Sequence, residues 1–206
     1  MDEWSVFLSP YRQAIDELKI KLKGIRQEYK LTNRSSPIEF VTARVKPVQS
    51  IIEKASKNNI SYDELRKDMY DIAGVRIMCQ FVDDIMIIRD LIDKREDMRI
   101  IEERDYIKHT KESGYRSYHI IIEYPVSTVD GTVNILAEIQ IRTLSMNFWA
   151  TIEHSLNYKY KGEYPVEIKE RLQNAADAAY QLDQEMSLIR EEVQEAQKFF
   201  SKKRNI

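Results

Sequence analysis

The chain has 206 residues, 43% of them hydrophobic, which is enough for one substantial core and short for two independent domains. Its 32 Lys and Arg residues nearly balance 34 Asp and Glu residues, so the net charge of -2 gives no global positive field for nucleic acid or an anionic membrane. No apolar stretch approaches the ~20 residues of a membrane span, and the first residues lack the order of a secretion signal. With Cys79 as its lone cysteine, the chain is expected to be cytoplasmic, and any anion site must be a local cluster.

The N-terminal third of the chain has the periodicity of helices. Apolar residues recur at every third or fourth position between residues 4 and 29, and Ser9 is placed to cap the main part of this helix before Pro10. The segment 36–39, Ser-Pro-Ile-Glu, has the residue types of a capping box and predicts a second helix toward Arg44. Further helices are expected at 48–55 and after the Ser61/Glu64 pair.

The middle of the chain has the patterns of β-strands. Residues 72–82 form an apolar run of strand length with β-branched side chains, which predicts a buried central strand. After a short helix, residues 98–107 are expected to form another strand. Segments 117–127 and 132–143 flank Asp130-Gly131, a dipeptide that favours the positive φ angles of a tight turn. These two segments therefore predict a β-hairpin.

The C-terminal part is expected to be helical, with one helix at 144–160 and a long one from 166 to about 201. The long helix carries apolar residues at helical intervals: Ile168, Leu172, Ala175, Ala179, Leu182, Met186, Ile189, Val193 and Ala196. This stripe needs a partner surface, either the protein's own sheet or the same helix of another subunit. Taken in order, the elements predict an α/β or α+β fold with a mixed sheet flanked by helices.

One face of the predicted hairpin is polar. With Asp130 and Gly131 as the loop residues, the expected opposite pairs are His119 with Arg142, Ile121 with Gln140, and Glu123 with Glu138. The two-residue period of a strand then gathers a polar set on one face: His119, Glu123, Glu138, Gln140 and Arg142. An ordinary solvated face is the alternative to a functional site. The isoleucines of the other face, Ile120, Ile122, Ile139 and Ile141, are core in either case.

Two acidic residues are candidates for a divalent-cation site. Asp71 immediately precedes the predicted buried strand, and Glu138 lies on the polar hairpin face. Mg²⁺ prefers one or two carboxylates and keeps waters and substrate phosphates as its other ligands, so this pair suits a nucleotide-bound ion. Cations that could neutralise a polyphosphate flank the pair in the sequence: Arg44, Lys46, Lys54, Arg76, Arg104, Lys108, Lys111 and Arg116. Any one of them could instead be a surface charge.

The segment 112–119 is the most distinctive stretch of the chain. Gly114 permits a tight approach, and Tyr115, Ser117 and His119 alternate onto one side. A purine base could stack on Tyr115, and His119 and Gln140 could offer hydrogen bonds along the same face. Structural roles for the tyrosine and the histidine are the alternative.

Over nearly its whole length the chain resembles the small alarmone synthetases of Firmicutes, RelQ-type single-domain relatives of the RelA/SpoT synthetase domain. The resemblance is carried by five segments: Ser36 to Pro47, Asp71 to Phe81, Lys111 to His119, Glu138 to Thr143 and Asn147 to His154. It implies a nucleotidyltransferase-like fold over residues 1–206. The reaction it implies passes the β,γ-pyrophosphate of ATP to the 3′-hydroxyl of GDP or GTP and releases AMP. By the same resemblance, bifunctional relatives hydrolyse the alarmone with a metal-binding domain that contains a His-Asp pair. No His is followed by Asp in this sequence, so synthesis without hydrolysis is expected.

The resemblance also implies roles for individual residues. It assigns ATP binding to Arg44, Lys46, Ser50, Lys54 and Arg76, with the two arginines sandwiching adenine. It assigns GDP or GTP binding to Arg104, Lys111, Tyr115, His119, Gln140 and Asn147, with the tyrosine stacking on guanine. Asp71 and Glu138 resemble the Mg²⁺ carboxylates and are the predicted catalytic residues. Glu138 is also the candidate base for the 3′-hydroxyl.

Members of this subtype resemble one another in forming homotetramers that pppGpp activates from a central cleft. The resemblance therefore implies a homotetramer, with 1–35 and 165–206 in subunit contacts, and pppGpp as activator. The candidate allosteric residues are Lys23 and Phe40; Ala43 stands where close relatives commonly have glycine. Some relatives are inhibited by single-stranded RNA, a possible further partner, whereas no membrane partner is expected.

Two other functions stay open on the sequence alone. The first is an RNA-binding regulatory module with weak or degenerate catalysis, against which the two retained carboxylates, Asp71 and Glu138, argue. The second is a nucleotidyltransferase that transfers AMP and frees pyrophosphate. Detection of AMP or of pyrophosphate as the released product distinguishes the second alternative from the proposed reaction.

Overall fold

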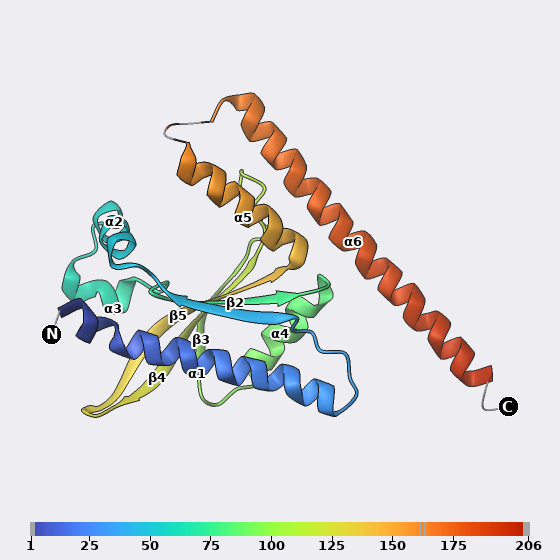
Figure 1. Ribbon diagram of the computed structural model, residues 1–206, viewed down its shortest axis with the longest axis horizontal. Helices are drawn as coiled ribbons and strands as arrows, with labels where there is room; N and C mark the ends of the chain where they lie inside the picture. The colour runs from blue at the N-terminus through green and yellow to red at the C-terminus, as the bar shows by residue number, and fades with distance from the viewer. Residues whose placement is uncertain (1–2, 161, 163, 204–206) are drawn as a thin grey trace.

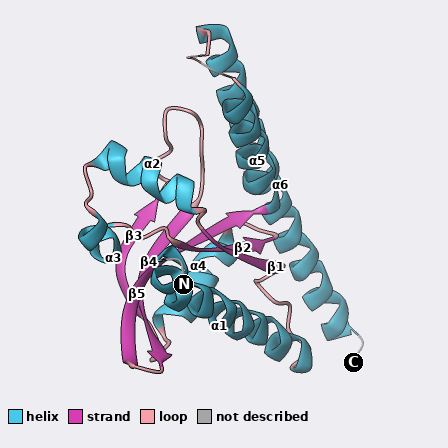
Figure 2. Ribbon diagram, turned by 60° about the vertical axis from the view of Figure 1, so that its left-hand side comes forward, coloured by secondary structure: helices cyan, strands magenta, loops and turns pink. Residues whose placement is uncertain are grey.

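A five-stranded mixed sheet with helices around it forms the centre of the molecule (Figures 1 and 2). The computed structural model describes residues 3–160, 162 and 164–203. The strands are β1 (Phe40–Val45), β2 (Ala73–Cys79), β3 (Arg99–Asp105), β4 (Tyr118–Thr128) and β5 (Gly131–Thr143). Their order in the sheet is β1-β2-β5-β4-β3; β2 and β5 are parallel, and the other neighbours are antiparallel. The predicted mixed sheet is confirmed.

The core lies on one face of this sheet. Alternate residues of the three central strands are fully buried there: Val75 and Ile77 of β2, and the four isoleucines predicted as core, Ile120, Ile122, Ile139 and Ile141. Helix α1 (Glu3–Leu31) packs on the sheet with Tyr11, Leu18 and Leu22 at 0% exposure. Burial of an aliphatic side chain stabilises the fold by about 1.5–3 kcal/mol. This apolar layer holds the opposite, polar face in place.

Helix α1 differs from the prediction at its start. It begins at Glu3 and runs through Pro10, so Ser9 is not its cap. A proline inside a helix removes one backbone hydrogen bond and normally destabilises it. Here Phe7, Leu8 and Tyr11 on either side of the proline are buried in the core, and the burial of these side chains outweighs that cost.

The predicted helix toward Arg44 is wrong, because that segment is strand β1. Ser36 makes a local turn instead of a helix cap: its hydroxyl accepts a hydrogen bond from the Ile38 amide at 3.1 Å. The Glu39 amide then donates to the Met78 carbonyl on β2 at 2.7 Å, which starts the sheet pairing. Three residues of the following Val-Thr-Ala-Arg-Val run are β-branched, and pairing with β2 outweighs the local capping pattern.

The remaining helices lie close to where the sequence places them. They are α2 (Val48–Asn58), the 3₁₀ turn η1 (Tyr62–Glu64), α3 (Leu65–Asp68), α4 (Asp83–Asp93), α5 (Leu144–Lys159) and α6 (Val166–Lys203). The predicted pair of Ser61 and Glu64 forms a capping box, with the glutamate accepting from the serine amide at 3.0 Å. Among the described residues, no helix is long and apolar enough to cross a bilayer.

The β4–β5 hairpin is confirmed, but its register is displaced by two residues. Thr128 pairs with Gly131, so the loop is Val129-Asp130 and Gly131, at φ +115°, already belongs to β5. The Thr128 hydroxyl closes the turn by donating to the Gly131 carbonyl at 2.7 Å. The predicted pairs are therefore replaced by His119 with Gln140, Ile121 with Glu138 and Glu123 with Leu136. Because a shift of two leaves every side chain on its predicted face, the polar face survives this correction.

Helix α6 runs beside α5 and extends past the rest of the molecule (Figure 1). The face that it turns to its own domain buries Ala176, Asp183 and Ser187. Of the predicted apolar stripe, Leu172 packs against α5, whereas Leu182, Met186, Ile189 and Val193 are 42–57% exposed. The protein's own sheet therefore does not cover the stripe.

Candidate active site

The sheet register aligns the polar side chains in two rows that cross all five strands. The first row runs from β1 to β3 through Thr42, Arg76, Gln140, His119 and Arg104. The second runs through Arg44, Gly74, Glu138, Ile121 and Glu102. Laterally paired residues project from the same face, so strands distant in sequence place these groups side by side.

A cavity of about 270 Å³ opens on this face. Six predicted site residues line it: Arg44, Lys46, Asp71, Arg76, Glu138 and Gln140. Gly74 also lines it, between Arg44 and Glu138 in the second row, and its missing side chain leaves the space above the sheet open. The structure thus brings together residues from three separate segments of the chain.

Asp71 is held by two lysines at the rim of the cavity. Its Oδ2 lies 2.7 Å from Nζ of Lys46 and 2.8 Å from Nζ of Lys54. Burial works to raise the pKa of Asp71, but the hydrogen bonds and charges of the two lysines outweigh it and hold that pKa below its ordinary value. The other carboxylate oxygen, Oδ1, is buried and has no hydrogen-bond partner among the described residues. Asp71 is therefore ionised at neutral pH with one oxygen available to a ligand.

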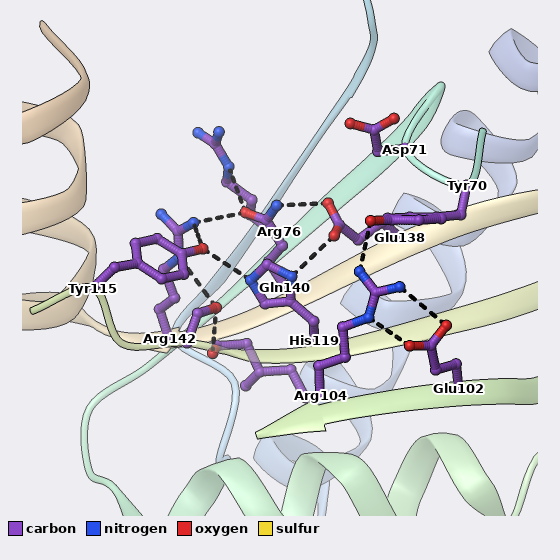
Figure 3. Close-up of polar contacts among 12 residues, drawn as sticks. Tyr70, Asp71, Arg76, Glu102, Arg104, Tyr115, His119, Glu138, Gln140 and Arg142 are labelled. Carbon is purple, nitrogen blue, oxygen red and sulfur yellow. Dashed lines mark hydrogen bonds and ion pairs between the residues drawn. The ribbon is translucent and has the colours of Figure 1, made fainter. Parts of the chain in front are cut away.

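Glu138 is held on the neighbouring strand by two polar side chains. Its Oε1 lies 2.9 Å from Nδ1 of His119, and its Oε2 accepts from the Gln140 amide at 2.7 Å. Burial raises the pKa of Glu138, and hydrogen bonding and charge from His119, with help from Gln140, more than offset it, so the pKa is lowered. The charge of Asp71 acts in the opposite direction on Glu138, which places the two carboxylates in one electrostatic site (Figure 3).

A closed ring of hydrogen bonds connects Glu138 to Arg142 (Figure 3). Arg142 Nη2 donates to the Tyr115 hydroxyl at 2.5 Å and to Oε1 of Gln140 at 2.8 Å. The Tyr115 hydroxyl lies 2.8 Å from Nε2 of His119, whose Nδ1 faces Glu138. All these bonds are satisfied when Tyr115 donates to Nε2 and the imidazole donates from Nδ1 to the carboxylate. The ring fixes the orientation of each polar group around Glu138.

The arginines make this site strongly attractive to anions. Burial lowers the pKa of Arg76, and repulsion from Arg142 and Arg44 lowers it further. Clustering three guanidinium groups costs electrostatic free energy that a polyphosphate would relieve. The site is therefore built to bind a highly charged anion beside two carboxylates.

Arg104 continues the site on the edge strand. Its guanidinium donates to the Tyr70 hydroxyl at 2.6 Å and lies 4.5 Å above the same ring, while Glu102 binds its other side at 2.6 Å. Lys54 lies 4.9 Å from the Tyr70 ring. Tyr70 thereby contacts both Lys54, which binds Asp71, and Arg104 on β3.

Lys111 and Tyr115 lie on the loop between β3 and β4. Nζ of Lys111 is 5.1 Å from the Tyr115 ring and 4.7 Å from the ring of Tyr106. Tyr106 in turn contacts the His119 ring edge-on at 5.0 Å. The predicted loop residues are therefore in contact with the network around Glu138.

Two predicted residues stand apart from this network. Ser50 lies in the first turn of α2 and Asn147 in the first turn of α5, and the side chain of neither joins the hydrogen bonds described above. Sequence reasoning placed Arg142 on the polar hairpin face without giving it a role, and it did not single out Tyr70 or Gly74. Tyr70 could have been found from its position next to Asp71.

The residues present fit a divalent cation. Asp71 and Glu138 supply two ionised carboxylates, and Oδ1 of Asp71 is a buried oxygen without a partner among the described residues. No cluster of three or more His, Cys, Asp or Glu that could hold a metal occurs in the described part of the chain. A two-carboxylate site of this kind suits Mg²⁺ that arrives with nucleotide phosphates.

A second cavity contains both candidate allosteric residues. Its volume is about 620 Å³, and it is lined by Lys23, Arg26, Gln27, Lys30, Phe40 and Val41. Three of these side chains are basic and come from α1, whereas Phe40 begins β1 and is 39% exposed. Cations around an aromatic ring suit a nucleotide polyphosphate.

Comparisons with known proteins identify the family of the chain. Residues 43–163 match the family described as a region found in RelA/SpoT proteins. The chain is 60% identical to the GTP pyrophosphokinase YjbM of Bacillus subtilis, over 98% of this chain and 95% of that protein. The chain belongs to the RelA/SpoT family.

Solved structures of relatives have the same fold. The crystal structure of small alarmone synthetase 1 from Bacillus subtilis bound to its product pppGpp aligns with a TM-score of 0.90 at 59% identity, covering 94% of this chain and 100% of that one. The same synthetase bound to AMPCPP aligns with a TM-score of 0.83 at 55% identity, covering 95% and 100%. The predicted nucleotidyltransferase-like fold is thus the fold of small alarmone synthetases.

Proposed function

We propose that this protein is a GTP pyrophosphokinase, which transfers the β,γ-pyrophosphate of ATP to the 3′-hydroxyl of GDP or GTP and releases AMP. The observation that carries the proposal is the placement of Asp71 and Glu138 in one site that is ringed by arginines and lysines. The similarity to a GTP pyrophosphokinase and to synthetase structures bound to pppGpp and AMPCPP supports it. The substrates are therefore ATP and a guanine nucleotide.

ATP is assigned to the cavity between β1 and β5. Arg44 and Arg76 are diagonal neighbours across the β1–β2 ladder, so a purine could lie between their planar groups above Gly74. Lys46 and Lys54, which bind Asp71 here, would turn toward the phosphates. Ser50 in the first turn of α2 would add a donor near the same groups.

The guanine nucleotide is assigned to the other side of Glu138. Tyr115 would stack on the base, while Lys111, Arg104 and His119 neutralise or bind the polar groups of the nucleotide. Asn147 in the first turn of α5 and Gln140 add further hydrogen bonds. The two nucleotides then meet over Glu138.

Glu138 is the proposed general base for the acceptor hydroxyl. Its lowered pKa keeps it ionised at neutral pH, and His119 and Gln140 hold its two oxygens in place. Phosphoryl-type transfer otherwise requires positioning and charge neutralisation, which the surrounding cations provide.

Asp71 and Glu138 are the proposed ligands of Mg²⁺. The bound ion would neutralise phosphate charge during transfer. Residues of the chain do the rest: they bind both nucleotides, align the attacking hydroxyl and accept its proton.

One assay tests the function. Purified protein is incubated with Mg²⁺, ATP labelled at the γ-phosphate, and GDP, GTP or GMP in separate reactions. The proposal expects label in a guanosine product together with equimolar AMP. Release of pyrophosphate with label-free product would instead indicate an AMP-transferring enzyme, and RNA binding without any transfer would indicate a regulatory module. Incubation with purified ppGpp alone is expected to release no pyrophosphate.

The second cavity is the proposed activator site. Lys23, Arg26 and Lys30 would bind the phosphates of pppGpp, and Phe40 would contact its base. Phe40 starts the same strand that carries Arg44, so a ligand there contacts the strand that lines the ATP cavity. Adding pppGpp to the assay above tests this, with Lys23→Ala expected to remove the activation.

We also propose that the protein is a homotetramer, in which 1–35 and 165–206 make subunit contacts around a single synthetase domain. The apolar stripe of α6 repeats at alternating intervals of three and four residues, which is the spacing of helix–helix seams. From Leu182 onward it is exposed in the isolated chain, whereas the residues of α6 that are buried there, Asp183 and Ser187, are polar. Another copy of this chain is the partner that such a self-complementary stripe fits.

A further inference from the structure

The loop that carries Tyr115 rests directly on helix α6. Gly114 adopts φ +85°, and a Cβ at this position would come within 2.6 Å of the Ala176 Cβ and 3.4 Å of the Gln173 Cα. No side chain other than hydrogen fits this approach without displacing the helix. The contact places the residue before Tyr115 against the N-terminal third of α6.

The residue after Tyr115 is tied to the same helix. Arg116 Nη2 donates to Oδ1 of Asp177 at 2.7 Å, and Nη1 donates to the Gly114 carbonyl at 3.2 Å. Its guanidinium lies 4.7 Å from the Tyr180 ring, and its side chain is 11% exposed. Arg116 Nε is already buried without a partner among the described residues. Loss of the Asp177 carboxylate would therefore remove the charge that neutralises this buried guanidinium.

An apolar cluster completes the contact beneath the tyrosine. Trp149 and Ala150 of α5 and Ala176 of α6 are buried together, with Tyr115 and Leu172 packed against them. The Trp149 indole donates to the Leu172 carbonyl at 2.9 Å, which fixes α5 against α6. Tyr115 is thus supported below by this cluster and on either side by Gly114 and Arg116.

We propose that Asp177 is a positioning residue for the acceptor nucleotide: through Arg116 it holds the 114–116 segment on α6, so that Tyr115 is presented beside His119 and Glu138. The inference rests on the proposed function of this loop as the guanine-nucleotide site. None of these contacts involves the β1–β5 cavity that is assigned to ATP. The anchor therefore acts on the acceptor and leaves the donor unaffected.

The consequence is a selective effect on KM. Asp177→Asn removes the charge that pairs with Arg116 and lets the loop sample other positions, so KM for GDP is expected to rise about tenfold. KM for ATP and kcat at saturating GDP are expected to stay within about twofold. Glu185→Gln, an exposed charge removal on the same helix, is the matched control and leaves all three values unchanged.

A double-mutant cycle ties the effect to the Arg116–Asp177 pair. Arg116→Gln alone should raise KM for GDP at least as much as Asp177→Asn, and the double variant should add no further increase. Thermal unfolding of each variant establishes that the fold persists. An unchanged KM for GDP in Asp177→Asn, additive effects in the double variant, or an equal rise in KM for ATP would each overturn the proposal.

A binding measurement keeps this test separate from the proposed activity. Titration of native protein and Asp177→Asn with GDP alone, followed by calorimetry, measures acceptor affinity without turnover. Weaker GDP binding by the variant, with equal affinity for a non-hydrolysable ATP analogue, supports the anchor. If native protein released no AMP, the proposed function would fail, while GDP affinity would still decide whether Asp177 positions the loop.

Discussion

The centre of the sheet and helix α6 bury opposite kinds of side chain. At the sheet centre an apolar face supplies the core, and the polar residues project from the opposite face into an open cavity. From Asp183 onward, polar residues of α6 face inward: Asp183 accepts a hydrogen bond from the Thr143 hydroxyl at 2.6 Å and another from Ser145, and Arg190 pairs with Asp84 at 2.8 Å. The apolar stripe of α6 is left at the surface.

This difference indicates what kind of partner each region suits. The sheet face holds clustered positive charges, so it suits a small, highly charged anion. The helix holds an exposed hydrophobic seam, so it suits another apolar surface. A charged ligand site and a protein contact can thus be distinguished by which kind of side chain is left uncovered.

The largest effect is expected at the two carboxylates. Glu138→Gln or Asp71→Asn should lower the rate of AMP release by at least about 100-fold, because each removes a proposed metal ligand and the former also removes the base. Radiolabel transfer from ATP to GDP measures it. Glu123→Gln, on the same face of β4 but outside the cavity, is the control and should keep full activity. Normal activity of Glu138→Gln would show that the sheet face is not the reaction site.

Placing charges in the α6 stripe should produce the next largest effect. The double variant Leu182→Glu with Met186→Glu is expected to dissociate the assembly, since burial of these exposed side chains would drive it. Sedimentation velocity measures the change in mass. Gln184→Glu adds a charge to an exposed position on the same helix and should leave the assembly intact. An unaltered mass in the double variant would contradict a role for the stripe in self-association.

Filling the space above Gly74 should weaken ATP binding by a smaller factor. A Cβ at this position would lie at an ordinary 3.7 Å from the Arg44 carbonyl, so the backbone accepts a side chain here. Gly74→Val should raise KM for ATP about tenfold without lowering the melting temperature, because a β-branched residue suits the strand. Gly74→Ala should raise it less. If both variants bind ATP as the native protein does, the cavity is not the donor site.

The smallest effect expected is a dependence of stability on pH. The folded-state pKa of Asp71 lies below its unfolded value of about 3.9, so its ionisation stabilises the fold above that pH and the contribution is lost as the pH falls through the folded pKa. Native protein should therefore be more stable than Asp71→Asn at pH 7, and the difference should shrink below about pH 4. Urea unfolding at a series of pH values measures it, with the exposed Asp16→Asn as control. A gap that widens in acid would show that Lys46 and Lys54 do not stabilise the carboxylate.

The central strands and their polar face were predictable from the sequence because a two-residue period fixes which side chains share a face. That inference tolerated a wrong hairpin register, since the displacement was an even number of residues. The segment 36–45 was not predictable in the same way. Its local pattern favours a helix start, and pairing with β2, which lies about thirty residues further along the chain, decides the outcome.

Most residues of the candidate site could be named from the sequence, but the hydrogen bonds between them could not. The motif segments identified Glu138, His119 and Tyr115 as site residues. The ring that joins them through Arg142 depends on side-chain directions that no sequence pattern specifies. The outward orientation of the α6 stripe was likewise undetermined, because a 3.5-residue repeat is the same whether the seam meets its own sheet or another chain.

Because β5 lies at the centre of the sheet, the two proposed nucleotide sites are formed by separate stretches of the chain. Strands β1 and β2 lie on one side of it, and β4 and β3 lie on the other. The residues proposed to bind the donor nucleotide thereby lie before position 80, and many of those proposed to bind the acceptor lie between 99 and 119. Glu138 on β5 lies between the two groups in the sheet. Either half could change its preferred nucleotide through mutation while the other half, and the shared carboxylate, stayed as they are.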